Sequence, residues 1–179
     1  GNEIARLEAG TAVVLATGAE YRRLPVPEIQ SYEGVSIFYA AGPQDARRCS
    51  ATRVGVVGGG NSAAQAAIWL SRGGALVTLL HRRADLAETM SDYLIREIGY
   101  NDVIRVQPFG QAVDGGGDER LQWITVRDLN TGEETRREDA GLFLLLGAEP
   151  GGGWRPASRF PDGLGLVLYR LAVAATVSG

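Results

Sequence analysis

Three consecutive glycines, Gly58-Gly59-Gly60, constrain the fold more than any other feature, because they lie between a strand pattern and a helix pattern. Before them, Val54 to Val57 is an apolar run typical of a strand that is covered on both faces. After them, apolar residues recur at helical spacing, at Ala63, Ala66, Ala67 and Leu70. Gly73-Gly74 ends this helix, and Ala75 to Leu80 supplies a second apolar strand. This order predicts a right-handed β-α-β unit in a parallel sheet.

Further strands and helices are expected on both sides of this unit. Thr11 to Ala16 is an apolar run that predicts a buried strand, and Leu24 to Glu28, which contains two prolines, predicts a linker or turn. Short helices are expected over Pro43 to Cys49, with proline in the first turn, and over Ser91 to Ile98. Val103 to Val106 predicts a third short strand.

The pattern changes after this strand, to short alternating runs separated by turn signals. The turns are predicted at Asp114 to Asp118 and at Asn130 to Gly132. Gln122 to Arg127 and Glu134 to Arg137 should therefore pair as an antiparallel hairpin, and Gly141 to Leu146 returns to a fully apolar strand. The predicted fold class is α/β, a Rossmann-like β-α-β dinucleotide-binding domain with a parallel sheet, helices and an antiparallel β-meander.

The glycine loop has the spacing Gly58-x-Gly60-x-x-Ala63, which suits a bound pyrophosphate. The first glycine permits a tight turn, the second lets the phosphates approach the backbone, and the alanine keeps the helix close to the sheet. Either Asn61 or Ser62 could cap the helix, whose free N–H groups attract anions. The predicted phosphate contacts are Gly58, Gly59, Gly60, Asn61, Ser62 and Ala63. The alternative is a glycine-rich turn without a ligand, but the strand-to-helix context favours the binding site.

The end of the second strand indicates which dinucleotide would bind. Sites that select NADH place Asp or Glu about 20 residues after the loop, where it holds the ribose 2′-OH. This chain has His81-Arg82-Arg83 there instead, and two arginines would pair with a 2′-phosphate. The sequence therefore favours NADPH, although a solvated strand end is the alternative. His81, the only histidine, could contact the cofactor or could simply end the strand.

Composition excludes several other classes of function. The net charge is −3, so no basic surface indicates a nucleic-acid partner. A single cysteine, Cys49, allows neither an internal disulfide nor a paired metal site, and no metal is expected. Leu164 to Val177 is apolar but short and is interrupted by Arg170, so no membrane span is expected. Exclusive use of arginine among the basic residues and the lack of a secretion signal favour a bacterial, cytoplasmic protein.

Four motifs together resemble thioredoxin-reductase-like flavoproteins of the pyridine nucleotide-disulfide oxidoreductase family. They are ATG at Ala16 to Gly18, GGGNSA at Gly58 to Ala63, HRR at His81 to Arg83 and LFLLLGAEP at Leu142 to Pro150. The resemblance covers roughly residues 11–150. It implies an NADPH domain inserted into an FAD domain, hydride transfer from NADPH to FAD, and reduction of a Cys-x-x-Cys pair in the NADPH domain by the flavin.

The resemblance divides the chain into three parts. Residues 1–32 would be a partial FAD-domain segment and linker, 33–148 the NADPH-binding domain, and 149–179 a partial return to the FAD domain or an aberrant tail. The ATG residues Ala16, Thr17 and Gly18, together with Gly147, would belong to the cofactor contacts. FAD would be bound only in the intact protein, for which a homodimer is one expected form.

The chain departs from the family pattern at several positions. Phe38 and Ala41 stand where the two cysteines should follow Gly34-Val35-Ser36, so disulfide reduction by that pair is excluded. Cys49 is interpreted as structural, and Ala87 replaces an arginine that often follows HRR. The second glycine motif, for FAD, and the closing Gly-Asp motif are also missing. The sequence leaves three functions open: a flavoprotein reductase, with ferredoxin or flavodoxin as an acceptor, a nucleotide-sensing regulatory module, and a truncated non-catalytic fragment.

Overall fold

A computed structural model describes residues 19–150 of the 179-residue chain. The strand expected over Thr11 to Ala16, the ATG motif and the apolar stretch near the C-terminus lie outside the described residues. The chain divides into two compact units, Tyr21–Gly147 and the combination of Gly1–Glu20 with Ala148–Gly179. Of the second unit, the structure describes residues 19–20 and 148–150. They belong to two strands that pair with each other, β1 (Ala19–Tyr21) and β10 (Ala148–Pro150).

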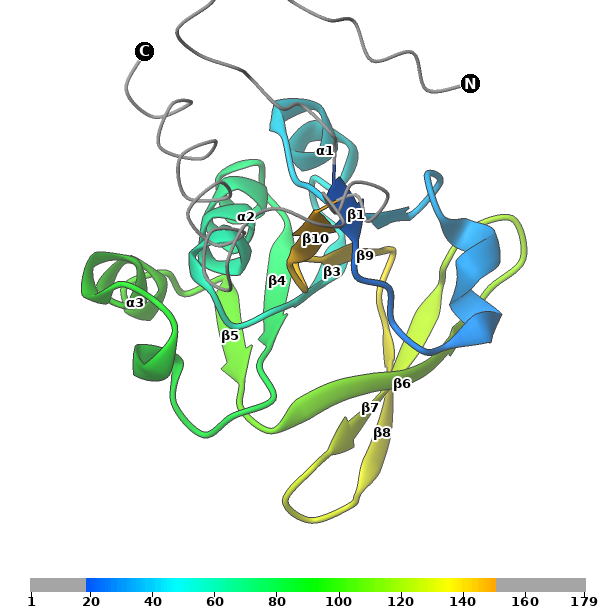
Figure 1. Ribbon diagram of the computed structural model, residues 1–179. Helices are drawn as coiled ribbons and strands as arrows, with labels where there is room; N and C mark the ends of the chain where they lie inside the picture. The colour runs from blue at the N-terminus through cyan, green and yellow to red at the C-terminus, as the bar shows by residue number, and fades with distance from the viewer. Residues whose placement is uncertain (1–18, 151–179) are drawn as a thin grey trace, which may run out of the picture. The chain divides into compact units, whose positions relative to one another are not determined.

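The unit Tyr21–Gly147 is built on a five-stranded parallel sheet with the strand order β2-β9-β3-β4-β5 (Figure 1). Its strands are β2 (Ile37–Phe38), β3 (Arg53–Val57), β4 (Leu76–Leu80), β5 (Ile104–Gln107) and β9 (Gly141–Leu144). All four neighbouring pairs are parallel. The predicted unit of strand, glycine loop, helix and strand is therefore confirmed as β3-α2-β4.

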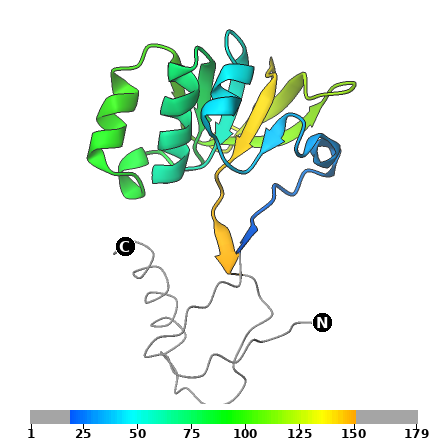
Figure 2. The ribbon, with the colours of Figure 1, turned by 90° about the horizontal axis from the view of Figure 1, so that it is seen from above.

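Three helices cover one face of this sheet, and Figure 2 shows them gathered on one side. They are α1 (Pro43–Arg48), α2 (Asn61–Arg72) and α3 (Asp92–Gly99). Alternate strand side chains, among them Val54 and Val56 of β3, form a buried cluster with the alanines of α2. These small side chains let the helix lie close to the sheet, which fixes the position of its N-terminus.

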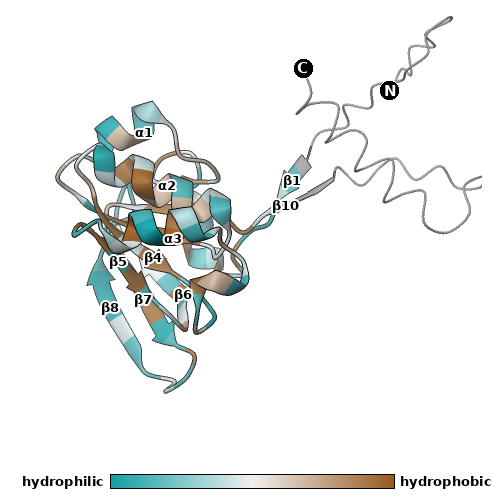
Figure 3. Ribbon diagram, turned by 90° about the vertical axis from the view of Figure 1, so that its left-hand side faces the viewer, coloured by the Kyte–Doolittle hydropathy of each residue, from teal (hydrophilic) through white to brown (hydrophobic). Residues whose placement is uncertain are grey.

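A second layer covers the opposite face. It is an antiparallel meander of β6 (Gly110–Gly116), β7 (Trp123–Asp128) and β8 (Glu134–Glu138). Val57 and Leu80 point into the core under this meander, as the period of two along β3 and β4 requires. The outer strand β8 is hydrophilic along its length (Figure 3). The predicted α/β fold class, with a parallel sheet and an antiparallel meander, is confirmed.

The meander has a strand that the sequence did not predict. Asp114 to Asp118 was expected to be a turn, but β6 continues to Gly116 and the connection to β7 follows it. A Cβ on Gly115 would lie 2.7 Å from Ile29 Cγ2, and one on Gly116 would lie 2.7 Å from the Trp123 ring. These glycines therefore serve close packing within a strand, which the turn prediction overlooked.

The segment expected to be a linker, Leu24 to Glu28, belongs to the same core. Leu24 and Val26 are buried under the meander, and a 3₁₀ helix, η1 (Pro27–Tyr32), follows them. The Tyr32 hydroxyl donates to the carbonyl of Gly117 in the β6–β7 connection (2.6 Å). The compact unit therefore begins at Tyr21, because these apolar side chains gain stability by burial.

A partly buried polar contact joins the meander to the parallel sheet. Arg137 of β8 donates to Thr78 Oγ1 of β4 (2.6 Å) and to Asp139 Oδ1 (3.1 Å). The second carboxylate oxygen, Oδ2, lies 2.6 Å from Arg137 Nε as an ion pair without hydrogen-bond geometry. Burial raises the pKa of the Asp139 carboxyl, although the arginine acts in the opposite direction. The arginine thereby neutralises a carboxylate that the fold has taken from water.

Candidate functional site

The carboxyl ends of β3, β4 and β5 lie at one edge of the parallel sheet, and the glycine loop follows β3 there. Gly58 has a φ of +155°, and a Cβ on it would lie 2.6 Å from the Leu145 carbonyl oxygen and 2.9 Å from Ala63 Cβ. Its N–H donates to the Leu80 carbonyl (3.2 Å). Only glycine fits this turn, and a fully buried alanine at the start of α2 completes the close packing.

Gly60 differs from Gly58 because a side chain there would meet no atom at a prohibitive distance. It is the N-cap of α2 with φ of −101°, and the nearest atom to an added Cβ would be the Thr89 carbonyl oxygen, 3.9 Å away. Within residues 19–150, no acceptor takes the N–H groups of Gly60, Asn61 or Ser62. Free donors at a helix N-terminus beside open space suit an anion.

The sequence expectation that Asn61 or Ser62 caps α2 is wrong. Gly60 occupies the N-cap position, and Asn61 is already the first helical residue. The Asn61 side chain instead bonds Ser91 twice, donating to its hydroxyl (3.0 Å) and accepting from its N–H (2.8 Å). This pair ties the start of α2 to the start of α3, because Ser91 is the N-cap of that helix.

His81 supports the loop from within the protein. The side chain is buried, and a Cβ on Gly59 would lie 2.4 Å from its Nδ1 atom. Its Nε2 lies 2.8 Å from the carbonyl oxygen of Asp85. Because a carbonyl can only accept, Nε2 carries the proton in this contact. Of the two roles that the sequence left open, the geometry favours the buried strand-end histidine over a ring that stacks on a ligand.

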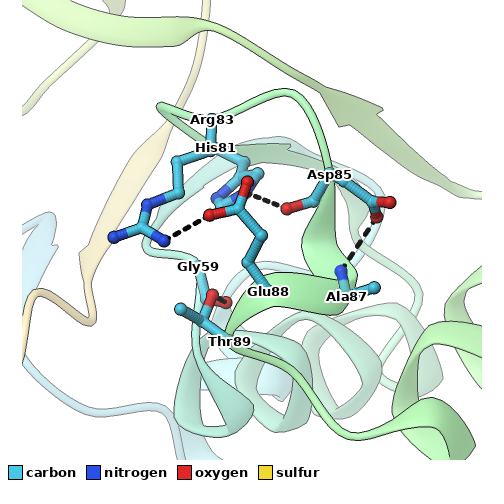
Figure 4. A network of polar contacts seen from close by, with 7 residues as sticks. All are labelled: Gly59, His81, Arg83, Asp85, Ala87, Glu88 and Thr89. Carbon is cyan, nitrogen blue, oxygen red and sulfur yellow. Dashed lines mark hydrogen bonds and ion pairs between the residues drawn. The ribbon is translucent and has the colours of Figure 1, made fainter.

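The two arginines that follow are exposed but not equivalent. Arg82 has no partner among the described residues, whereas Arg83 pairs with Glu88 at 2.5 Å between Nη1 and Oε2 (Figure 4). About half of each side chain of this pair is exposed. A carboxylate therefore stands beside the arginines, and the sequence interpretation missed it.

A short 3₁₀ helix, η2 (Leu86–Glu88), places this carboxylate. Asp85 caps it by accepting from the Ala87 N–H (2.9 Å), and Leu86 and Met90 are buried on either side. The Thr89 hydroxyl donates to the Gly59 carbonyl (2.6 Å), as Figure 4 shows. The signal that could have revealed the segment is Asp85, a capping residue followed by a buried leucine.

Four predicted cofactor contacts remain, and the structure describes only one of them, Gly147. Ala16, Thr17 and Gly18 lie outside the described residues. Gly147 has a φ of +88° and lies beyond β9, and its carbonyl accepts from the Arg22 N–H (3.1 Å). Within the described part of the chain, no group of His, Cys, Asp and Glu side chains could hold a metal ion. No helix there is long and apolar enough to cross a membrane.

Apolar packing fills the segment where the resembled family carries its cysteine pair. Phe38 stacks on Phe143 of β9 with ring centroids 5.2 Å apart, and Ala41 packs against the helix-side core. Cys49 is free and buried at the C-terminal end of α1. Burial, and then the nearby Asp45 carboxylate, raises the pKa of its thiol. Its side chain belongs to the core rather than to an exposed thiolate site.

A parallel sheet with this glycine loop, helices on one face and a meander on the other defines a dinucleotide-binding class of α/β domain. The chain belongs to the pyridine nucleotide-disulphide oxidoreductase family, which matches residues 5–151. It is 32% identical over 139 residues to thioredoxin reductase of Mycolicibacterium smegmatis, an alignment that covers 78% of this chain and 44% of the relative.

Other comparisons agree with this membership. The chain is 33% identical over 141 residues to thioredoxin reductase of Neurospora crassa, covering 78% of this chain and 42% of the relative. The crystal structure of thioredoxin reductase from Lactococcus lactis superposes with a TM-score of 0.72 at 26% identity, over 82% of this chain and 48% of that one. The chain thus spans less than half the length of these relatives.

Proposed function

We propose that this chain is the NADPH-binding part of a thioredoxin-reductase-like flavoprotein oxidoreductase, in which hydride passes from NADPH to FAD. The lack of close contacts beside Gly60, next to N–H groups at the start of α2 that have no acceptor within residues 19–150, is the observation that carries this proposal. A pyrophosphate fits there because its oxygens accept from backbone N–H groups and need close approach. Bound NADPH would supply the hydride.

The residues of the chain would bind and orient this cofactor. Gly58 shapes the turn, and Gly60, Asn61 and Ser62 offer their N–H groups to the phosphates. Arg82 and Arg83 lie at the end of the next strand, where charge-assisted hydrogen bonds to a 2′-phosphate would favour NADPH over NADH. His81 and Thr89 hold the Gly59 backbone from two directions, through a ring contact and a hydrogen bond.

The domain organisation is part of the same proposal. Residues 33–148, together with residues 21–32 that pack into the same compact unit, would form the NADPH domain, while 1–20 and 149–179 would contribute to an FAD domain. Ala16, Thr17, Gly18 and Gly147 would then lie near FAD in the intact protein. We also propose that the intact protein is a bacterial, cytoplasmic protein and that it forms a homodimer.

The electron acceptor should not be a protein disulfide. Exchange needs an attacking thiolate and a second sulfur to resolve the mixed disulfide. Phe38 and Ala41 carry no thiol, and Cys49 is a single buried thiol with a raised pKa. We propose a one-electron or quinone-like acceptor, such as a ferredoxin or flavodoxin.

The test uses the natural gene product that contains this chain, supplied with FAD and NADPH. We expect NADPH to bleach the flavin absorbance and a quinone to restore it. Turnover of a disulfide dye should stay at background with or without thioredoxin, and Cys49→Ser should change nothing. Disulfide turnover that depends on Cys49 would refute the proposed acceptor class. NADPH binding without any flavin reduction would favour a nucleotide-sensing module instead.

A further inference from the structure

Glu88 is held in the proposed cofactor site by the fold around it. Buried Leu86 and Met90 anchor the backbone on both sides, and Asp85 caps the short helix that ends at Glu88. Thr89, the next residue, is bonded to the carbonyl of Gly59 in the glycine loop (2.6 Å). The main chain that carries the carboxylate is therefore held within one residue of the loop contact.

This position puts a negative charge where a 2′-phosphate would need a positive one. The Glu88 carboxylate forms an ion pair with the Arg83 guanidinium, with 2.5 Å between Oε2 and Nη1. A phosphate that uses Arg83 must either displace this carboxylate or accept it as a close like-charged neighbour. Arg82 is exposed and without a partner in the described part of the chain, so it alone is unconditionally available to the phosphate.

We infer that Glu88 is a specificity-determining residue which competes with the 2′-phosphate for Arg83 and so lowers the preference for NADPH over NADH. The inference rests on the proposed function, because it concerns the same site. NADH lacks the 2′-phosphate and leaves the Arg83–Glu88 pair intact. The two cofactors should therefore differ in how strongly they respond to removal of the Glu88 charge.

The chain offers a matched pair of substitutions for the test. Glu88→Gln removes the carboxylate in the site, and Glu97→Gln removes one from the Arg72–Glu97 pair, which is similarly exposed and joins α2 to α3. Both variants change the net charge equally. NADPH and NADH are titrated into each variant of the 179-residue chain by calorimetry, and thermal unfolding checks that each variant remains folded.

For Glu88→Gln we expect NADPH affinity to rise about three- to tenfold, the size of an exposed ion pair plus repulsion of the phosphate. NADH affinity should change less than about twofold, since that cofactor has no charge at this position. The gain should shrink at high salt, which screens exposed charges. For Glu97→Gln, both affinities should stay within about twofold of the unmodified chain.

Four outcomes would count against the inference. An equal change for both cofactors in Glu88→Gln, or the same gain in Glu97→Gln, would show a general charge effect and overturn it. No change in either affinity in Glu88→Gln, in a chain whose NADPH binding is lost in Gly60→Val, would overturn the inference and leave the proposed function standing. If neither cofactor binds the unmodified chain, the proposed function fails first, and the role of Glu88 fails with it.

Discussion

The carboxyl edge of the parallel sheet and the segment around Phe38 differ in what they keep of the resembled family's pattern. At the edge, Gly58, Gly60 and Ala63 have the contacts and the open space that a phosphate-binding turn requires. In the other segment, two apolar side chains, Phe38 and Ala41, stand at the cysteine positions and pack into the core. In the proposed function the first region would bind a dinucleotide, whereas the second carries no thiol for disulfide exchange.

This difference separates the requirements of nucleotide binding from those of disulfide exchange. Binding needs backbone N–H groups and space, which depend on a local turn and a helix end. Exchange needs two sulfurs, and any other side chain removes it completely. Substitutions in the two regions should therefore affect different measurements: those at the sheet edge alter nucleotide affinity, and those near Phe38 alter stability.

The largest expected effect on binding is that of Gly60→Val. The fold should tolerate it, because φ is −101° and the nearest atom to an added Cβ lies 3.9 Å away. The side chain would occupy the space of the pyrophosphate, so NADPH affinity should fall about a hundredfold or more, about 3 kcal/mol. Calorimetry measures the affinity, and thermal unfolding measures the fold.

Gly99→Val is the control for this substitution, since the α3 residue has nothing within 4 Å of an added Cβ and lies away from the loop. It should leave affinity unchanged. Unaltered NADPH binding in Gly60→Val would mean that the glycine loop is only a turn, and the contrast between the two regions would disappear.

A smaller effect is expected from removing Arg82 and Arg83 together. Charge-assisted hydrogen bonds contribute about 1–3 kcal/mol each, and the existing pair with Glu88 reduces the share of Arg83. The double alanine variant should therefore lose most of the preference for NADPH over NADH, at a total of about 1–3 kcal/mol. Titration with both cofactors measures the ratio, and equal affinities already in the unmodified chain would refute this role.

The smallest effect on binding is expected from Phe38→Ala. This ring stacks on Phe143 and is partly buried, so its removal should destabilise the fold by about 1–3 kcal/mol. NADPH affinity should not change, because the Phe38–Phe143 stack belongs to the core and not to the glycine loop. Denaturant unfolding gives the first quantity and calorimetry the second. A large loss of affinity in a folded variant would show that the two regions are coupled.

Local patterns predicted the part of the site that one β-α-β unit forms. The apolar run at Val54 to Val57, the glycines and the spaced alanines of α2 are neighbours in the sequence, so the turn at Gly58 and the packing of Ala63 could be read directly. His81 and the two arginines also follow from the end of β4. These features need no knowledge of distant contacts.

Contacts between distant residues explain the rest. Gly115 and Gly116 pack against Ile29 and Trp123, so the usual meaning of a glycine cluster as a turn misled the prediction. Asn61 bonds Ser91 thirty residues away, in place of capping its own helix. Glu88 is only five residues from Arg83 in the sequence, but its segment is fixed by the bond from Thr89 to Gly59, thirty residues away. A single sequence does not reveal these pairings.

The most direct test of NADPH binding at the glycine loop is a titration of the isotopically labelled chain, followed by the backbone amide signals. Saturating shifts should be largest at Gly60, Asn61 and Ser62, whose N–H groups have no acceptor in the described part of the chain. Signals near Phe38 should move little. Absence of saturable shifts, or shifts confined to the outer face of the meander, would contradict the account.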